Sequence, residues 1–176
     1  SLHSHFENSA KYDEANNRNQ NWNCDFDKGA TVEFWMQKDS FTVGRQEVVL
    51  DLWNGKPSGD PERGRVLLYA FESVGNQKLA LRVEKGPNVF QDFLNATSLD
   101  FTSWHQNGPI FQVDFYIDGH LIRTITQSQT INSISGRMDG FIGSLFGDFG
   151  IYGESDGKLQ ASLDEFRFWK TKRTAR

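Results

Sequence analysis

The sequence predicts an all-β protein, an antiparallel two-sheet β-sandwich, and three observations carry this prediction. Apolar side chains recur at every second residue in several segments, which is the period of a half-buried strand. Turn-forming pairs such as Asn54-Gly55, Gly86-Pro87 and Asp118-Gly119 separate these segments. No stretch of about 11 residues or more keeps the apolar spacing of an amphipathic helix. Short strands punctuated by turns, without alternating helices, favour a sandwich.

Each predicted strand places one set of side chains on a core and the other set on a more polar face. Residues 117–121 are expected to form a hairpin, because Asp118-Gly119 accepts the positive φ angles of a type I′ turn. The basic run 170–176 is expected to be a solvated exit from the domain. The apolar sets, in chain order, are Val32, Phe34 and Met36; Val48, Leu50 and Leu52; Leu79, Leu81 and Val83; Phe111, Val113, Phe115 and Ile117; and Phe166 and Phe168.

Composition excludes several classes of protein. The chain has 176 residues with 19 Lys plus Arg and 23 Asp plus Glu, so the net charge of −4 gives no general attraction for nucleic acid. Aromatic residues make up 14 %, which is too rich for a disordered chain. No apolar run approaches the roughly 20 residues that cross a bilayer, so no membrane insertion is expected. We interpret residues 1–176 as one domain, a module of a larger protein.

Three segments occur in an order that resembles the laminin G-like branch of the concanavalin A-like jelly-roll superfamily. They are Thr31-Val32-Glu33-Phe34-Trp35-Met36, the hairpin Phe115-Tyr116-Ile117-Asp118-Gly119, and a closing strand that ends in Leu163-Asp164-Glu165-Phe166-Arg167-Phe168-Trp169. The resemblance implies a jelly-roll sandwich. The chain departs from the pattern after His105, where Gln106-Asn107-Gly108-Pro109 follows at once. Two explanations are open: the hairpin is shortened there, or residues that belong to the pattern are missing from this chain. The superfamily hosts lectins, adhesion modules and glycosidases, so function has to be argued from a site.

A glycosidase on this fold needs two carboxylates that face one bond, about 5 Å apart for a retaining mechanism. The nearest pair is Glu47 and Asp51, which the alternation places on one face with Val49 between them. At roughly 3.3 Å per residue these two lie about 13 Å apart along the strand. That separation is too large for paired carboxylate chemistry, so we assign no catalytic residue and expect no enzyme.

Asp51, Asn54 and Asp60 form a candidate calcium site. The segment from Asp51 to Asp60 resembles the metal loop of legume-type lectins, although Val49 stands where those lectins carry a further acid. Ca²⁺ takes six to eight oxygen ligands, of which these side chains supply three. Two interpretations stay open at this point: a weak calcium site, and a polar turn in which the side chains bond the backbone.

The polar faces of the predicted strands combine aromatic rings with charged groups. Sugars stack on aromatic rings while carboxylates and amides bond their hydroxyls, so this combination is typical of a glycan-binding surface. Trp35 and Trp169 are more readily explained as part of a second packed layer or as cross-strand pairs that stabilise the sheet, because the pattern places their strands near the centre of a sheet. Trp53 precedes a turn-rich loop and is the better candidate. The predicted ligand-binding residues are Trp53, Asp51, Tyr116, Asp114 and Arg82.

The sequence therefore favours a non-catalytic recognition module that binds a glycan or another cell-surface ligand. Its expected setting is extracellular, on a cell surface or on a virion, next to other domains or subunits of a parent assembly. A structural or assembly module without a small ligand is the second hypothesis, and a glycoside hydrolase is the third. The expected partners include no nucleic acid and no membrane.

Overall fold

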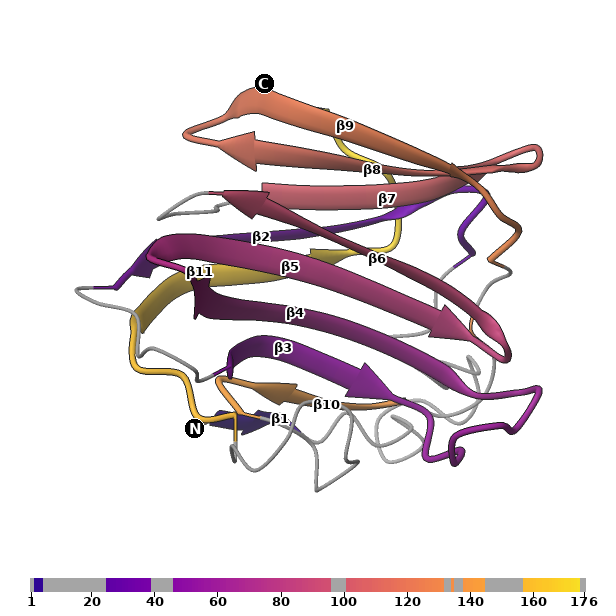
Figure 1. Cartoon of the computed structure of the whole chain (residues 1–176), viewed down its shortest axis with the longest axis horizontal. Coiled ribbons are helices and arrows are strands. Elements are labelled where there is room, and N and C mark those ends of the chain that lie inside the picture. The colour runs from indigo at the N-terminus through magenta and orange to yellow at the C-terminus, as the bar shows by residue number, and fades with distance from the viewer. Residues whose placement is uncertain are drawn as a thin grey trace, which may run out of the picture.

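The computed structural model describes residues 2–4, 25–38, 46–95, 101–131, 134, 138–144 and 157–174. These residues form two antiparallel sheets and no helix, as the sequence predicts (Figure 1). Sheet A has the strand order β1-β10-β3-β4-β5-β6, and sheet B has the order β11-β2-β7-β8-β9. The strands are β1 (Leu2–Ser4), β2 (Ala30–Gln37), β3 (Gln46–Trp53), β4 (Gly64–Ser73), β5 (Asn76–Lys85), β6 (Asn88–Asn95), β7 (Phe101–Asn107), β8 (Ile110–Ile117), β9 (His120–Ser128), β10 (Asp139–Ile142) and β11 (Ser162–Trp169).

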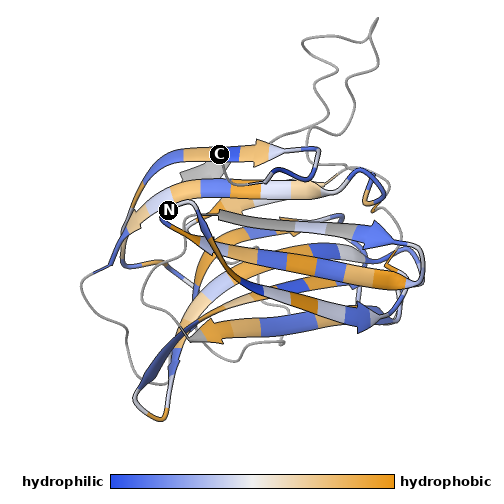
Figure 2. Ribbon diagram, turned by 90° about the horizontal axis from the view of Figure 1, so that it is seen from above, coloured by the Kyte–Doolittle hydropathy of each residue, from blue (hydrophilic) through white to orange (hydrophobic). Residues whose placement is uncertain are grey.

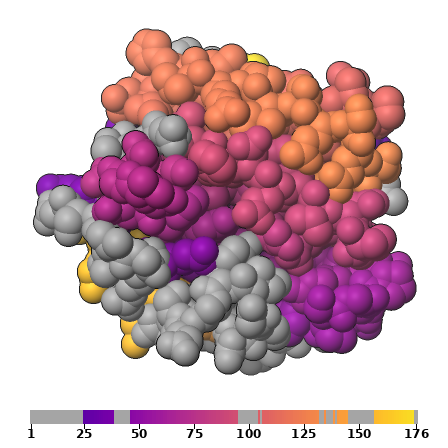
Figure 3. All heavy atoms as spheres, in the orientation of Figure 1, coloured from indigo at the N-terminus to yellow at the C-terminus, as the bar shows by residue number. Residues whose placement is uncertain are grey.

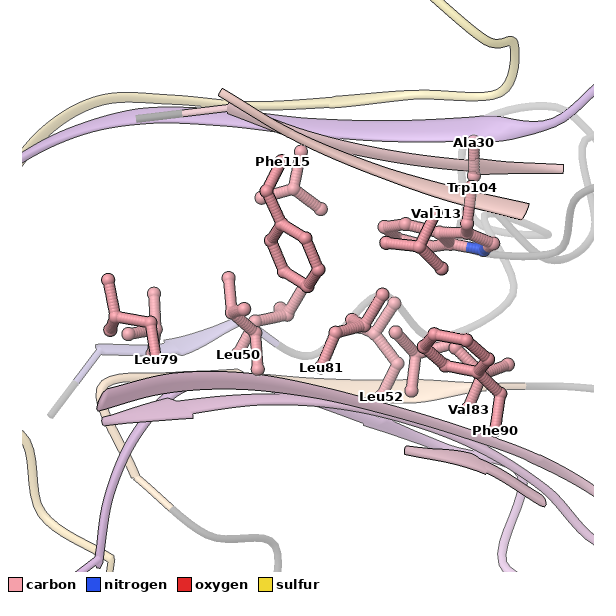
Figure 4. Packing of buried hydrophobic residues seen from close by; sticks show 14 of the residues in the cluster. Ala30, Leu50, Leu52, Leu79, Leu81, Val83, Phe90, Trp104, Val113 and Phe115 are labelled. Atoms are coloured by element: carbon pink, nitrogen blue, oxygen red, sulfur yellow. The ribbon is translucent and has the colours of Figure 1, made fainter. Parts of the chain in front are cut away.

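The main core lies between the two sheets. Leucine and phenylalanine side chains of sheet A meet Trp104, Val113 and Phe115 of sheet B (Figure 4). The rings of Phe90 and Phe111 bridge the layers with their centroids 5.3 Å apart. Each such ring contributes about 1.5–3 kcal/mol through burial alone. The predicted core sets of β2, β5 and β8 are confirmed, with Met36 and Ile117 at the margin of the core.

A β-bulge in β3 changes the predicted alternation of that strand. Val48 pairs with Tyr69, but the next pair is Leu50 with Leu68, so Val49 is the extra residue. Both Val49 and Leu50 therefore point into the main core, and Val48 points to the outer face of sheet A. The prediction that Glu47, Val49 and Asp51 share one face is wrong for this reason. Glu47 lies opposite core residue Ala70, and Asp51 lies opposite the outward Leu67.

β4 is buried on both of its faces along most of its length. Its outward side chains Leu67 and Tyr69 form a second apolar cluster with Val48 and Ala80, and Phe71 packs against it. A strand buried on both faces reads as a continuous apolar run and lacks the alternation by which the other strands were identified. For this reason the sequence of β4 carries no alternation that predicts a strand there.

Two hairpins of sheet B follow the predicted turn chemistry. Asp118 and Gly119 have φ angles of 50° and 74°, and Ile117 pairs with His120, which confirms the type I′ hairpin between β8 and β9. The β7–β8 hairpin closes at Asn107 and Ile110, so the short connection after His105 is a complete two-residue turn. Along the strands, hydrophilic and hydrophobic residues alternate in Figure 2. Within the described ranges, no helix has the length and apolarity needed to span a bilayer.

Candidate functional site

Asp51 forms a buried ion pair with Arg65 on the outer face of sheet A. Its two carboxylate oxygens accept hydrogen bonds from Nε and Nη2 of Arg65 at 2.8 and 2.7 Å. Both side chains are almost completely buried, with exposures of 0 % and 1 %. A bidentate carboxylate–guanidinium pair of this kind is charge-assisted and geometrically fixed. In this arrangement Asp51 has a structural role, and its oxygens are occupied by Arg65 rather than open to a ligand.

The other two residues of the predicted calcium set are also engaged within the 54–63 loop. Asn54 Oδ1 accepts hydrogen bonds from the backbone N–H of Gly64 and Lys56, and its Nδ2 donates to the carbonyl of Glu62. Asp60 Oδ1 accepts from the N–H of Glu62 at 2.7 Å. These are turn-forming bonds of the kind that Asn and Asp typically make. Because Arg65 holds Asp51 and the loop backbone holds Asn54 and Asp60, these contacts favour the polar-turn interpretation over the calcium site.

The carboxylate considered for hydrolysis, Glu47, is likewise held by protein groups. Its Oε2 accepts from Nζ of Lys38 at 2.6 Å and from the N–H of Gln160 at 2.8 Å. The bulge at Val49 turns Glu47 toward the core side of the sheet and Asp51 toward the outer side. These two carboxylates therefore cannot face one substrate bond.

Of the two predicted sheet B residues, Asp114 contacts the segment that follows β11. Asp114 accepts hydrogen bonds from Thr124 and Gln112, and it forms an ion pair with Lys172 at 3.0 Å. Burial by itself raises the pKa of Asp114, but these hydrogen bonds and the charge of Lys172 outweigh burial and hold the pKa below its ordinary value. Burial, and then the charge of Asp114, raise the pKa of Tyr116.

The expectation that the basic run after Trp169 is a solvated exit is only partly correct for its described residues, because Lys170, Thr171 and Thr174 are exposed whereas Lys172 and Arg173 are partly buried. The Thr31 hydroxyl donates to the Thr171 carbonyl and accepts from the Arg173 N–H, which ties this segment across β2. Arg173 also pairs with Glu33 at 2.7 Å and lies over the ring of Trp169, 4.2 Å from its centroid. Lys172 and Arg173 therefore neutralise acids of sheet B instead of extending fully into solvent.

Exposure of the tryptophan rings differs from the sequence-based interpretation. Trp35 is 55 % exposed and Trp169 is 36 % exposed, so neither forms part of a second packed layer. β11, which carries Trp169, is the edge strand of sheet B rather than a central strand. Trp53 is half-buried, and its Nε1 donates to the Lys56 carbonyl at 3.0 Å.

The structure does not bring the five predicted ligand-binding residues together. Asp51, Trp53 and Arg82 point outward from sheet A, whereas Asp114 and Tyr116 point outward from sheet B. The two outer faces lie on opposite sides of the core. Alternation along a strand tells which residues share its face, but it does not tell which sheet the strand joins.

A cavity of about 260 Å³ lies where the 54–63 loop meets the β5–β6 hairpin. Figure 3 shows these two segments side by side at the right of the molecule, and the Gly86 N–H donates to the Arg63 carbonyl at 2.7 Å. Of the predicted residues, only Arg82 lines it. The charged lining residues are Arg63, Arg82 and Glu84, and the remainder are Ser58, Gly59, Gly86, Pro87 and Val89.

Sequence reasoning missed Arg63 and Glu84 as site residues. Glu84 was within reach, because the period of two places it on the face of Arg82. Arg63 lies in the non-repetitive segment before β4, and no local pattern brings it to β5. Its Nε donates to Glu84 Oε2 at 2.6 Å, across 21 residues of sequence.

Comparison with known proteins adds information on the fold. No family model matches the chain, and no curated protein matches it. Among solved structures, the native heptameric SAP-like pentraxin from Limulus polyphemus is similar, with a TM-score of 0.54 and 13 % sequence identity. The match covers 89 % of this chain and 74 % of the pentraxin chain. At this identity the likeness concerns the fold alone. The chain therefore has a two-sheet jelly-roll β-sandwich fold, and the comparison supports the laminin G-like resemblance at the level of the fold alone.

Proposed function

We propose that this chain is a non-catalytic recognition module that binds a glycan or another surface ligand at the 54–63 end of sheet A. The observation that carries the proposal is the arrangement around the Lys56 carbonyl. This oxygen accepts from Trp53 Nε1 at 3.0 Å and from Arg63 Nη1 at 2.7 Å. An aromatic ring and a charged cavity are thereby fixed to one loop, and a sugar needs both an apolar platform and polar groups.

The absence of catalysis in this proposal is supported by the hydrogen bonds of the two carboxylates considered for hydrolysis. Glu47 and Asp51 each accept hydrogen bonds from a buried cationic side chain, Lys38 or Arg65. A general acid needs access to the leaving-group oxygen, and a buried carboxylate held by a cation lacks that access. We extend the proposal to an extracellular, cell-surface or virion setting, in which such a module recognises its ligand beside other domains or subunits.

A broad glycan panel, probed with the purified protein, tests this function. We expect binding to at least one oligosaccharide class, and we expect Trp53→Ala to abolish it while Trp169→Ala, on the opposite sheet, leaves it unchanged. Trp53→Phe keeps a ring but loses the bond to Lys56, so it separates stacking from loop positioning. Thermal melting of each variant shows that it is folded. The proposal fails if the panel yields no binding, if only Trp169→Ala removes binding, or if any oligosaccharide is cleaved.

An assembly module is the second candidate, and the outward rings of Trp35 and Trp169 favour it. Large exposed rings on an outer strand pair are more common at protein interfaces than on free surfaces. The similar pentraxin is a heptamer by its description. Sedimentation analysis of the wild-type protein and of Trp35→Ser decides between the candidates. A multimer that dissociates in the variant, together with an unreactive glycan panel, favours assembly.

A further inference from the structure

Two arginines share one carboxylate at the cavity between the 54–63 loop and the β5–β6 hairpin. Nε of Arg63 donates to Oε2 of Glu84, and Nε of Arg82 donates to Oε1. Their Nη1 atoms donate to the Lys56 carbonyl and to Gln91 Oε1, respectively. Within the described part of the chain, Nη2 of neither arginine has a hydrogen-bond partner. Each guanidinium is therefore fixed in place with donor capacity left over.

The charges of the groups that line this cavity do not sum to zero. Two guanidinium groups face one carboxylate, and Arg63 and Glu84 are 4 % and 3 % exposed. Burial alone raises the pKa of Glu84, but the hydrogen bonds and charges of both arginines outweigh burial and lower it, so Glu84 is ionised at neutral pH. Arginine is always protonated in proteins. The lining thus keeps one positive charge in a poorly hydrated setting, where a bound anion is the natural complement.

The size of the cavity limits what enters it. Its volume of about 260 Å³ lies just below the roughly 300 Å³ at which pockets begin to hold drug-sized ligands. One substituent or one sugar ring fits this volume, and a longer chain has to continue over the surface. Side-chain exposure separates the roles of the two arginines: Arg82 is 21 % exposed and reaches a ligand, whereas Arg63 is buried behind it.

We propose that this cavity binds the carboxylate or sulfate group of an acidic saccharide. Arg82 is the contact residue and donates to the anion. Arg63 is a positioning residue, because it holds Glu84, which in turn holds Nε of Arg82, and it adds the second positive charge. Ser58 brings a hydroxyl donor to the rim. This inference rests on the proposed function and narrows its ligand to acidic glycans.

Calorimetric titration with three matched hexasaccharides tests the proposal. The first alternates uronic acid with N-acetylhexosamine, the second is its sulfated form, and the third is the first with its carboxyl groups reduced to alcohols. We expect binding of the first or second and at least a tenfold loss for the third. Arg82→Gln should weaken the acidic ligand by about 10-fold to 100-fold, since a hydrogen bond to a charged group is lost. Arg167→Gln removes the same charge from sheet B and should change nothing.

The outcomes separate this inference from the function on which it rests. Equal binding of acidic and neutral hexasaccharides, lost in Trp53→Ala, overturns the acidic specificity and leaves glycan recognition standing. Acidic binding that Arg82→Gln does not weaken overturns the cavity as the site. Arg82→Lys keeps the positive charge but loses the planar guanidinium and its paired donors, and this variant should retain part of the affinity. Inorganic sulfate and acetate, titrated as competitors, tell which anionic group the cavity accepts.

Discussion

Replacing Asp51 by alanine should destabilise the protein strongly, because the substitution leaves the Arg65 guanidinium buried without its counter-ion. The two oxygens that Arg65 binds lie at 2.8 and 2.7 Å, and Arg65 is only 1 % exposed. Removing one partner of such a buried pair costs about 3–5 kcal/mol. For a domain of this size, each kcal/mol lowers the Tm by about 2–4 °C, so we expect a fall of roughly 6–20 °C.

Urea unfolding followed by tryptophan fluorescence, together with thermal melting, measures this loss. The matched control is the double variant Asp51→Leu with Arg65→Met, which replaces the pair by apolar side chains of similar length. Such replacements are often neutral or stabilising by about 1–4 kcal/mol. We therefore expect the double variant to be more stable than Asp51→Ala alone. If Asp51→Ala unfolds at the wild-type urea concentration, the carboxylate is not in a buried ion pair, and its sequence-based role as a ligand for sugar or calcium regains support.

Three further predictions concern pH, the cavity hairpin and calcium. The folded-state pKa of Asp114 lies below its unfolded value of about 3.9, so the stability that this carboxylate contributes is present above that pH and is lost as the pH falls through the folded pKa. The Tm of Asp114→Asn should therefore fall less steeply with decreasing pH than the Tm of the wild type. Parallel curves of Tm against pH would contradict this. Gly86 has a φ of 54°, and a Cβ at this position would lie 2.5 Å from the Pro61 carbonyl oxygen, whereas Gly119, with a φ of 74°, has open space around it. Both Gly86→Ala and Gly119→Ala should cost about 1–3 kcal/mol of backbone strain, and Gly86→Ala should lower the Tm further because of the clash. Equal losses of Tm would mean that the hairpin does not contact Pro61. Millimolar calcium should leave the melting curve unchanged, because Asn54 and Asp51 are engaged; a rise that Asp60→Ala removes would restore the calcium site.

The fold could be predicted because the alternation of apolar side chains and the turn-forming residues indicate the same architecture. The alternating sets of β2, β5 and β8 became the core, and Asp118-Gly119 made the predicted turn. The main local error came from Val49, since a bulge inserts one residue without a sequence signature and moves Val48 and Glu47 to the opposite faces. β4 gave no alternation because both of its faces are buried.

The site was predicted less well because it depends on contacts between distant segments. The alternation predicts that the aromatic and acidic residues share one polar face, yet Asp114 and Asp51 lie on different sheets. Lys172 neutralises Asp114, and Arg65 neutralises Asp51. Lys172 follows the last strand, and no local rule reveals that its segment returns across sheet B. Arg82 was found from its strand face, whereas its partner Arg63 became visible only through the three-dimensional contact with Glu84.

Amide chemical-shift mapping of the isotope-labelled protein with the acidic hexasaccharide shows directly whether the ligand binds at the cavity. It locates the ligand without a substitution and therefore without a change in stability. The proposed site predicts that the largest shifts cluster at residues 54–64 and 82–89, around the cavity, and that the carboxyl-reduced hexasaccharide gives much smaller shifts. Shifts that cluster instead around Trp35, Tyr116 and Trp169 on sheet B, or no shifts at all, would contradict it.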